Sequence, residues 1–292
     1  MIFAAVSAPQ WTTALVFLIL GCIIGSFLNV CIWRLPRGLS ISKPSHSFCP
    51  HCEAPIRWHD NIPLLSFALL GGKCRRCRGA ISWRYPLVEG LTGVLFAAAY
   101  LAHPAAPIGT VIIMALLIAL LIVASAIDME FLIIPDEISL FGLLGGLAAG
   151  FMLPELHVGE ASHHTFASLT GLWHLDGLLG SGIGAAVGGG LTLVTAVFGS
   201  IIFRREAMGI GDAKLMAMVG AFMGWKVAVI GFFVAPLFGL LYGVPLLLLK
   251  DEHVMPYGPF LSTASVLVII FRRAACGFFQ QYIDIVRSLF GG

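Results

Sequence analysis

Four cysteines in a polar stretch of the sequence have the spacing of metal ligands. Cys49 and Cys52 form one C-x-x-C pair, Cys74 and Cys77 form a second, and 21 residues (53–73) separate the pairs. Four thiolates around a tetrahedral ion make a closed structural zinc site with no open position for chemistry. The gap is just beyond the usual zinc-ribbon spacing, so redox-active or incidental cysteines are the alternative. The spacing predicts a zinc ion that stabilises the fold.

Two aspartates interrupt sequence that is otherwise apolar. Asp128 lies in SAIDMEFLIIPDEISL, and Asp212 lies in MGIGDAKLM. An acidic residue at a helix C-terminus is mildly unfavourable, so Asp128 has no evident structural role, and an ionisable residue inside a span is a candidate functional residue. Asp212 has an alternative interpretation as a helix N-cap. Gly209 and Gly211 would let another backbone approach it closely.

Two carboxylates that share one site cannot both ionise easily, so one holds a proton while the other is charged, as in aspartic proteases. The charged carboxylate would remove a proton from water, and the protonated one would polarise a peptide carbonyl. Asp128 and Asp212 are therefore the predicted catalytic pair, with Lys214 and Asp136 as supporting residues beside the glycines. Asp136 follows Pro135, and a helix-start role is its alternative.

These residues must be positioned by helices in a membrane. Of the 292 residues, 59% are hydrophobic and 11% are charged, whereas soluble domains carry about 25% charged residues. The apolar runs are continuous rather than alternating, which favours helices over a barrel. We expect an all-α polytopic membrane protein with about eight transmembrane helices. The runs are 11–33, 87–102, 108–127, 137–153, 177–203, 207–225, 227–249 and 254–271.

The basic residues predict the orientation. Nine of the 17 Lys and Arg residues lie between Arg34 and Arg84, which places this loop in the cytoplasm and the N-terminus outside. Alternation of the spans puts residues 154–175, which hold no Lys or Arg, outside in agreement with the rule, but it puts Arg272 and Arg273 outside against it. No basic residue precedes the first run, so it is not a cleavable signal peptide. The two aspartates lie toward the cytoplasmic face.

The cytoplasmic loop is predicted to fold as a small domain. About 50 residues usually need a staple such as zinc, and the reducing cytosol argues against disulfides. Its basic surface suits anionic lipid headgroups, and no recognised fold supports nucleic-acid binding. Cys22, Cys31 and Cys276 are predicted to be packing residues. The expected organisation is a first transmembrane helix (1–33), a cytoplasmic four-cysteine domain (34–86), a transmembrane domain (87–271) and a C-terminal amphipathic tail (272–292).

Five motifs in order resemble those of one known family. They are GSFLNVCIWRLPRG, CPHCEAPIRWHDNIPLLSF, ISWRYPLVE, AIDMEFLIIPD and GIGDAKLM. Over about residues 18–270 the chain resembles the type IV prepilin peptidases, also called leader peptidase/N-methyltransferases, which belong with the GxGD aspartyl proteases. The resemblance implies that Asp128 and Asp212 are the catalytic aspartates. It also ties the four-cysteine region to the cytoplasmic domain and to methyl transfer.

The resemblance further implies a bifunctional enzyme of the bacterial inner membrane. Such an enzyme cleaves the leader of type IV prepilins and type II secretion pseudopilins, and then methylates the new N-terminal amine with S-adenosylmethionine. No glycine-rich cofactor fingerprint is visible. Glu89 is a candidate for binding the new amine or the cofactor at the methyltransferase site, and a helix-start acid is its alternative. Prepilins, pseudopilins and membrane lipids are the expected partners.

Two segments depart from the family pattern. The outer loop 154–175 contains His157, His163, His164 and His174, and we interpret it as a solvated loop rather than a metal site. Residues beyond Arg272 have apolar residues at helical spacing and are expected to lie along the membrane surface.

Two other functions fit parts of the sequence. A non-catalytic, zinc-stapled scaffold for pilus or secretion assembly explains the cysteines and the spans but not two aspartates on one face. A transporter also places acids in spans, but two transporter-like repeats are not evident.

Overall fold

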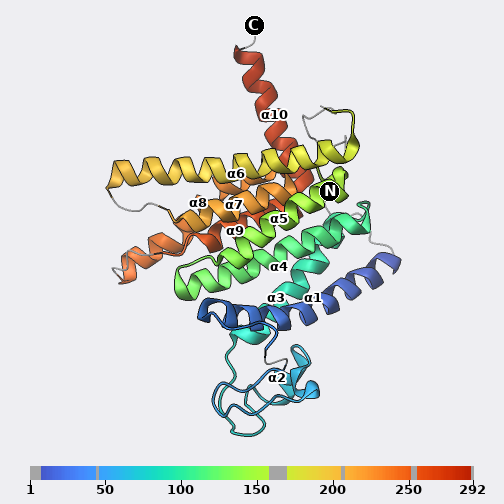
Figure 1. Ribbon diagram of the computed structural model, residues 1–292, viewed down its shortest axis with the longest axis vertical. Helices are drawn as coiled ribbons and strands as arrows, with labels where there is room; N and C mark the ends of the chain where they lie inside the picture. The colour runs from blue at the N-terminus through green and yellow to red at the C-terminus, as the bar shows by residue number, and fades with distance from the viewer. Residues whose placement is uncertain (1–7, 44–45, 158–169, 205–207, 251–254, 291–292) are drawn as a thin grey trace. The chain divides into compact units, whose positions relative to one another are not determined.

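The computed structural model describes residues 8–43, 46–157, 170–204, 208–250 and 255–290, and over those residues it is helical without any β-strand (Figure 1). Two isolated β-bridges, Phe48 with Pro55 and Lys73 with Ala80, are the only extended pairings described. The all-α prediction is therefore confirmed. The α-helices are α1 (Ala8–Arg34), α2 (Leu65–Leu69), α3 (Arg84–Ala102), α4 (Ile108–Phe131), α5 (Asp136–Met152), α6 (Trp173–Phe203), α7 (Ile210–Met223), α8 (Trp225–Lys250), α9 (Gly258–Ile270) and α10 (Arg272–Phe290).

A helix forms within each of the eight predicted spans. Helices α1, α3, α4, α6 and α8 are long and apolar enough to cross a membrane, and α9 with α10 makes a sixth if that bent pair counts as one span. Helices α5 and α7, with 17 and 14 residues, are shorter than the roughly 20 residues of a full span. The chain is a polytopic membrane protein.

The chain divides into two compact units, residues 1–106 and 107–292. In the first unit α1 and α3 pack through small residues. A Cβ atom added to Gly21 would lie 2.7 Å from the Cα of Gly93, and one added to Gly25 would lie 2.7 Å from the Cα of Glu89. Glycines allow helix backbones in a membrane to approach this closely, where van der Waals packing drives association.

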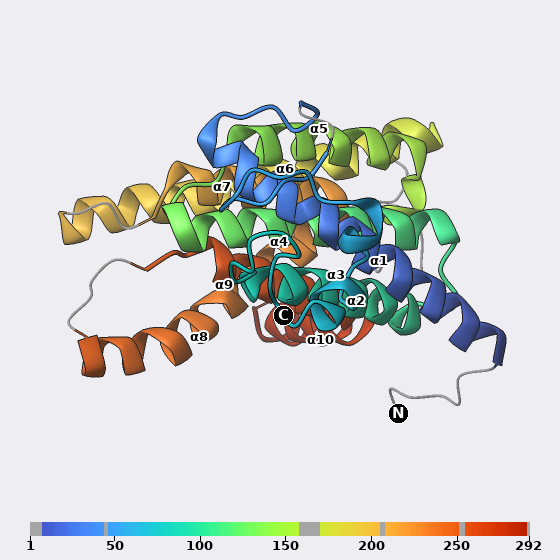
Figure 2. The ribbon, with the colours of Figure 1, turned by 90° about the horizontal axis from the view of Figure 1, so that it is seen from below.

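In the second unit α7 is the central helix. It packs against α4, α5, α6, α8 and α9, and the two ribbon views show α4, α5 and α7 side by side (Figures 1 and 2). Gly184 of α6 and Gly220 of α7 face each other so closely that neither tolerates a side chain. The Ser181 hydroxyl of α6 donates to the Ala221 carbonyl of α7 at 2.7 Å. A short helix is thus held by close backbone contact on several sides.

The predicted outer loop begins as a packed turn rather than as a solvated segment. Pro154 and Leu156 form a buried 3₁₀ turn, and His157 is only 2% exposed. Burial lowers the pKa of His157 to about 4. His174 is exposed and its Nδ1 lies 2.8 Å from the Phe151 carbonyl oxygen. The solvated-loop interpretation is wrong for His157, while His163 and His164 lie outside the described residues.

The glycine contacts of α3 generate a paired prediction. A methyl group at Gly93 would meet the Cys22 Sγ at 2.6 Å and the Leu18 carbonyl oxygen at 2.8 Å, whereas one at Gly90 would meet only the end of the Leu64 side chain at 3.7 Å. We expect Gly93→Ala to destabilise the protein by about 1–3 kcal/mol through overpacking. Gly90→Ala should be neutral or stabilising by up to about 1 kcal/mol. Thermal unfolding in detergent measures both, and equal melting temperatures for the two variants would contradict the packing.

Candidate active site and metal centre

Asp128 lies in the last turn of α4 and is 6% exposed. Helix α4 ends because Leu132 adopts the left-handed conformation (φ 56°), and its N–H closes the last turn on the Asp128 carbonyl at 2.9 Å. The Asp128 Oδ2 accepts a hydrogen bond from the Gly258 N–H, 2.9 Å away at the start of α9. A buried carboxylate costs much free energy unless it is hydrogen-bonded, and this backbone donor supplies one bond.

Asp212 is the third residue of α7 and is 7% exposed. Its Oδ2 accepts a hydrogen bond from the Gly209 N–H at 3.1 Å. Gly209 is itself the N-cap residue, so Asp212 is not the N-cap. It is instead the acid at the third position, which reaches back to the N-cap backbone as in half of a capping box. This bond explains why an aspartate lies at the start of the helix, but the bond does not require the aspartate to be buried.

The two carboxylates come together within the second unit, close enough for Asp128 to act electrostatically on Asp212. The segment before α9 closes the same site, because Gly258 bonds Asp128 and Tyr257 lies within electrostatic range of Asp212. Ile134 packs beside this site. A Cβ atom on Gly258 would lie 3.2 Å from its Cδ1, and a Cβ atom on Gly211 would lie 3.2 Å from its Cβ. The Gly211 neighbour is thus a side chain rather than a backbone.

No sequence pattern predicts Gly258 or Tyr257 at this site. Residues 255–260 carry two prolines and no acid or histidine, so their sequence indicates only a helix start. A Cβ atom on Gly258 would lie 2.7 Å from the Asp128 Oδ2, which makes glycine a requirement of this contact.

Asp136 and Lys214 form an ion pair at the edge of the same region. The Lys214 Nζ lies 2.6 Å from the Asp136 Oδ1, and their side chains are 44% and 62% exposed respectively. An exposed pair of this kind adds little stability. Its effect is to join the start of α5 to the first turn of α7, which carries Asp212.

In the first unit the four cysteines meet. Their Sγ atoms all lie within 4.8 Å of one another, and the Cys49 Sγ and Cys77 Sγ are 3.8 Å apart. Four thiolates each about 2.3 Å from a zinc ion in tetrahedral geometry would stand about 3.8 Å apart. None of the seven cysteines forms a disulfide. The cluster can therefore hold a metal ion.

Two turns of the same shape present these thiolates. In the first, the Glu53 N–H donates to the Cys49 carbonyl at 2.8 Å, and in the second the Arg78 N–H donates to the Cys74 carbonyl at 3.0 Å. Glu53 and Arg78 each have a positive φ, 53° and 60°. The N–H groups of Cys77 and Arg76 lower the pKa of the Cys74 thiol to about 6, which favours its thiolate, whereas the pKa of the neighbouring Cys77 thiol is raised to about 11 among the other three thiols.

Glu89 is buried in the first unit, 7% exposed, and is not a helix-start residue, because α3 begins five residues earlier. Its Oε2 accepts a hydrogen bond from the Leu64 N–H at 2.8 Å, and its carboxylate also accepts one from the Ser26 hydroxyl. Leu64 has a positive φ of 59°, a conformation that costs free energy for a non-glycine residue. Glu89 thus holds a strained loop against α1 and α3.

Both the region that holds the four cysteines and the region that holds the two aspartates match known protein families. Residues 19–103 match the bacterial Peptidase A24 N-terminal domain model, and residues 115–244 match the type IV leader peptidase family model. The chain is 33% identical to a prepilin leader peptidase/N-methyltransferase of Aeromonas hydrophila, with 90% of this chain and 91% of that protein covered. Proteins of the same name from Klebsiella pneumoniae (38%, covering 70% and 83%) and Pseudomonas aeruginosa (33%, covering 87% and 88%) also match. No solved structure matches the chain.

The cysteine geometry predicts one thiolate-bound metal ion per chain. Purified protein loaded with Co²⁺ should show intense sulfur-to-cobalt absorption and about one equivalent of metal, because four thiolates suit a tetrahedral ion. Cys52→Ser should lose most of the bound metal, whereas Cys31→Ala, which changes a buried cysteine of α1 outside the cluster, should retain it. Equal metal content in the two variants would show that the cluster is not the site.

Proposed function

Since this chain belongs to the type IV leader peptidase family, we propose that it is a bifunctional membrane enzyme. It cleaves the leader peptide of type IV prepilins and type II secretion pseudopilins, and it then N-methylates the new N-terminal residue. The names of the relatives include both activities. The observation that carries the peptidase assignment is the buried pair of carboxylates formed by Asp128 and Asp212.

The proposed peptidase mechanism uses the two aspartates as one unit. One carboxylate is ionised and removes a proton from the attacking water, while the other is protonated and polarises the scissile carbonyl. Gly258 supports this by fixing the Asp128 Oδ2 through its backbone N–H, and Gly209 does the same for Asp212. Gly211, Lys214 and Asp136 support the start of α7 and α5.

The proposed cofactors are a structural zinc ion and S-adenosylmethionine. Zinc would be held by Cys49, Cys52, Cys74 and Cys77, whose sulfur spacing fits it. S-adenosylmethionine supplies an electrophilic methyl group when bound. The four-cysteine domain (34–86) is the proposed location of methyl transfer, and the transmembrane region (87–271) carries the peptidase.

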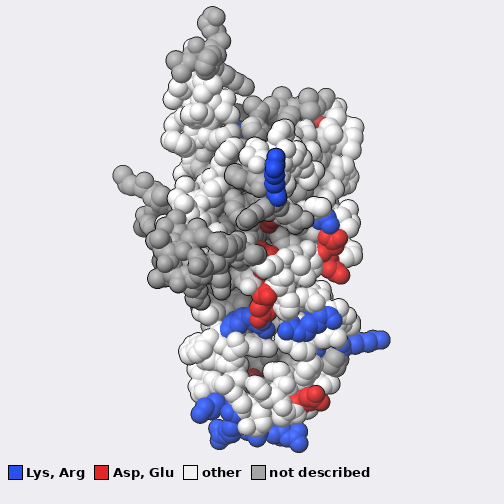
Figure 3. Space-filling view, turned by 90° about the vertical axis from the view of Figure 1, so that its left-hand side faces the viewer, with Lys and Arg blue, Asp and Glu red and all other residues white. Residues whose placement is uncertain are grey.

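We place the protein in the bacterial inner membrane, with the N-terminus periplasmic and residues 34–86 cytoplasmic. The exposed basic residues of that loop support this orientation. The second cysteine turn is surrounded by Lys73, Arg75, Arg76 and Arg78. Lys and Arg side chains gather at the lower end of Figure 3.

Helix α10 bends 93° from α9. It exposes Phe278, Tyr282 and Ile285 along one face, as expected for a helix that lies at the lipid surface.

Substitution of either aspartate separates the enzyme from the alternative scaffold. Asp128→Asn and Asp212→Asn should each slow leader release by about 10²–10⁴-fold. The double variant should be about as slow as either single one, because the carboxylates act as a unit. Glu137→Gln, an exposed acid in the first turn of α5, is the matched control and should cleave normally.

Mass spectrometry of a prepilin incubated with the protein in lipid, with and without S-adenosylmethionine, measures both activities. Loss of the leader with one added methyl group only when the donor is present supports the proposal. An untouched prepilin, with the protein folded and metal bound, would instead favour the scaffold. Normal cleavage by Asp212→Asn would refute the aspartate assignment.

The contact between α9 and Asp128 gives a further prediction about cleavage. Gly258→Ala places a methyl group 2.7 Å from the Asp128 Oδ2, so the carboxylate or the helix must move, and a displacement of about 1 Å can cost about 10²-fold in rate. Gly145→Ala is the control, because its new methyl group would lie 3.6 Å from the Phe222 ring and would meet no residue of the site. Single-turnover cleavage should be slow only in Gly258→Ala; normal cleavage there would show that this contact does not position Asp128.

A further inference from the structure

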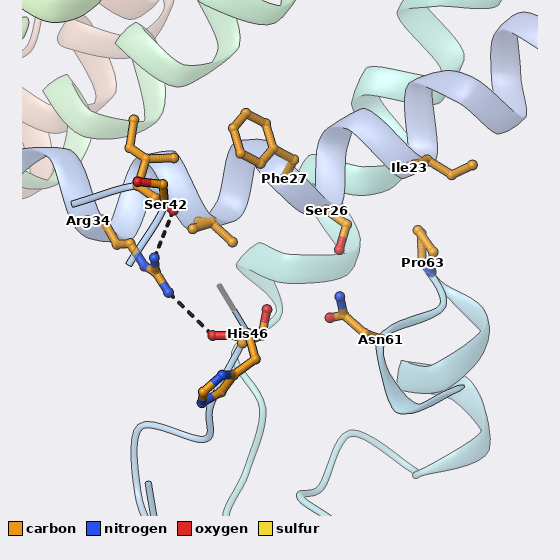
Figure 4. Close-up of a pocket in the computed structure, with 11 residues that line it drawn as sticks. Ile23, Ser26, Phe27, Arg34, Ser42, His46, Asn61 and Pro63 are labelled. Atoms are coloured by element: carbon orange, nitrogen blue, oxygen red, sulfur yellow. Dashed lines mark hydrogen bonds between the residues drawn. The ribbon is translucent and has the colours of Figure 1, made fainter. Parts of the chain in front are cut away.

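A cavity of about 390 Å³ lies beside α1 within the first unit (Figure 4). Helix α1 forms one wall with Ser26, Val30 and Arg34, and the loop after α1 forms the other wall with residues that include His46 and Asn61. Ser26, Val30 and Arg34 are spaced four residues apart, so they share one face of the helix and span about 12 Å at 1.5 Å per residue. Its volume falls within the range of pockets for small molecules and cofactors, about 300–1,000 Å³.

One end of the cavity carries a buried positive charge. Arg34 is 5% exposed, and its guanidinium donates to the carbonyl oxygens of Ser40 at 3.0 Å, Ile41 at 2.8 Å and His46 at 3.4 Å. Figure 4 shows its side chain directed from α1 toward the loop, close to Ser42 and His46. A buried guanidinium is the preferred partner of a carboxylate in proteins.

The other end carries the buried carboxyl group of Glu89 behind Ser26. The Ser26 hydroxyl lines the cavity and donates to Glu89. Glu89 also accepts the Leu64 N–H, which fixes the loop next to Pro63, another lining residue. In Figure 4 Ser26 and Asn61 lie at this end, opposite the Arg34 end. The cavity therefore offers a cation at one end and a carboxyl group, reached through a hydroxyl, at the other.

We propose that this cavity binds the S-adenosyl methyl donor, with its carboxylate at Arg34 and its sulfonium group toward the Ser26 end. Arg34 and Ser26 are the binding residues, and Glu89 is a positioning residue that acts through Ser26 and Leu64. The inference rests on the proposed methyltransferase function and adds the place where the donor binds. An anionic lipid headgroup would match only the Arg34 end, whereas a zwitterionic ligand matches both ends.

The first test measures equilibrium binding of radiolabelled S-adenosylmethionine to the full chain in lipid nanodiscs. Val30→Phe fills the cavity and should weaken binding at least about 10-fold, since overpacking excludes the ligand. Ile24→Phe makes a similar change on α1 outside the cavity lining and should bind as the natural chain does. Thermal unfolding of both variants shows whether they are folded.

The second test separates the two ends of the ligand and remains informative if Val30→Phe does not fold. Arg34→Gln should weaken S-adenosylmethionine binding by about 30-fold or more, as expected when one partner of a buried charge pair is removed. It should leave binding of 5′-methylthioadenosine, which lacks the carboxylate and the charged sulfur, within about twofold. Glu89→Gln should likewise weaken only the charged ligand.

The outcomes distinguish failure of the cavity assignment from failure of the proposed methyltransferase function. Methylation and donor binding that are unchanged in Val30→Phe and Arg34→Gln would overturn the cavity assignment and leave the methyltransferase intact. A natural chain that cleaves a prepilin but neither binds the donor nor methylates would overturn the methyltransferase proposal itself. Displacement of bound donor by vesicles of phosphatidylglycerol, but not of phosphatidylcholine, would assign the Arg34 end to lipid and also overturn the proposal.

Discussion

Burial of carboxyl groups among packed helices is the constraint on which the rest of this structure depends. A polar group that is shielded from water must find its hydrogen-bond partner within the protein. Asp128 and Asp212 meet this requirement with backbone N–H groups from Gly258 and Gly209. Those donors exist because helices α7 and α9 begin there, where the first N–H groups of a helix have no partner inside it. The position of the helix starts therefore decides where a carboxylate can be kept.

Close helix approach explains some of the 34 glycines of the chain. Helix starts bring donors to Asp128 only if the helices themselves approach closely, and an ordinary side chain would hold them apart. Gly184 and Gly220 bring α6 against α7, and Gly258 brings α9 against Asp128. In the first unit Gly25 does the same for Glu89. At these contacts glycine allows close packing of the helices, rather than serving as a source of flexibility.

Periodicity and composition were sufficient to predict the helical architecture and the cysteine cluster, because both depend on local sequence. The C-x-x-C spacing fixes a turn that needs few other residues, and the apolar runs mark the helices directly. Contacts between segments that lie far apart in the chain were harder to predict from the sequence. Gly258 has no side chain, and the Tyr257 phenol belongs to no recognisable motif. The burial of His157 depends on a neighbouring helix, since a Cβ atom on Gly180 would lie 2.7 Å from its Cβ. Glu89 is recognisable in the sequence as an acid, but its position five residues into α3 follows only from the structure.

The hydrogen bond between Gly258 and Asp128 joins residues 130 positions apart in the chain. A ribosome delivers the N-terminal part first, so a nascent chain that has already inserted α4 and α7 holds both aspartates without this bond. The bond can form only after the start of α9 has been synthesised, which follows the synthesis of both aspartates. Order of synthesis thus makes completion of the carboxylate pair later than the insertion of α4 and α7, and a chain that stops before α9 lacks the finished site.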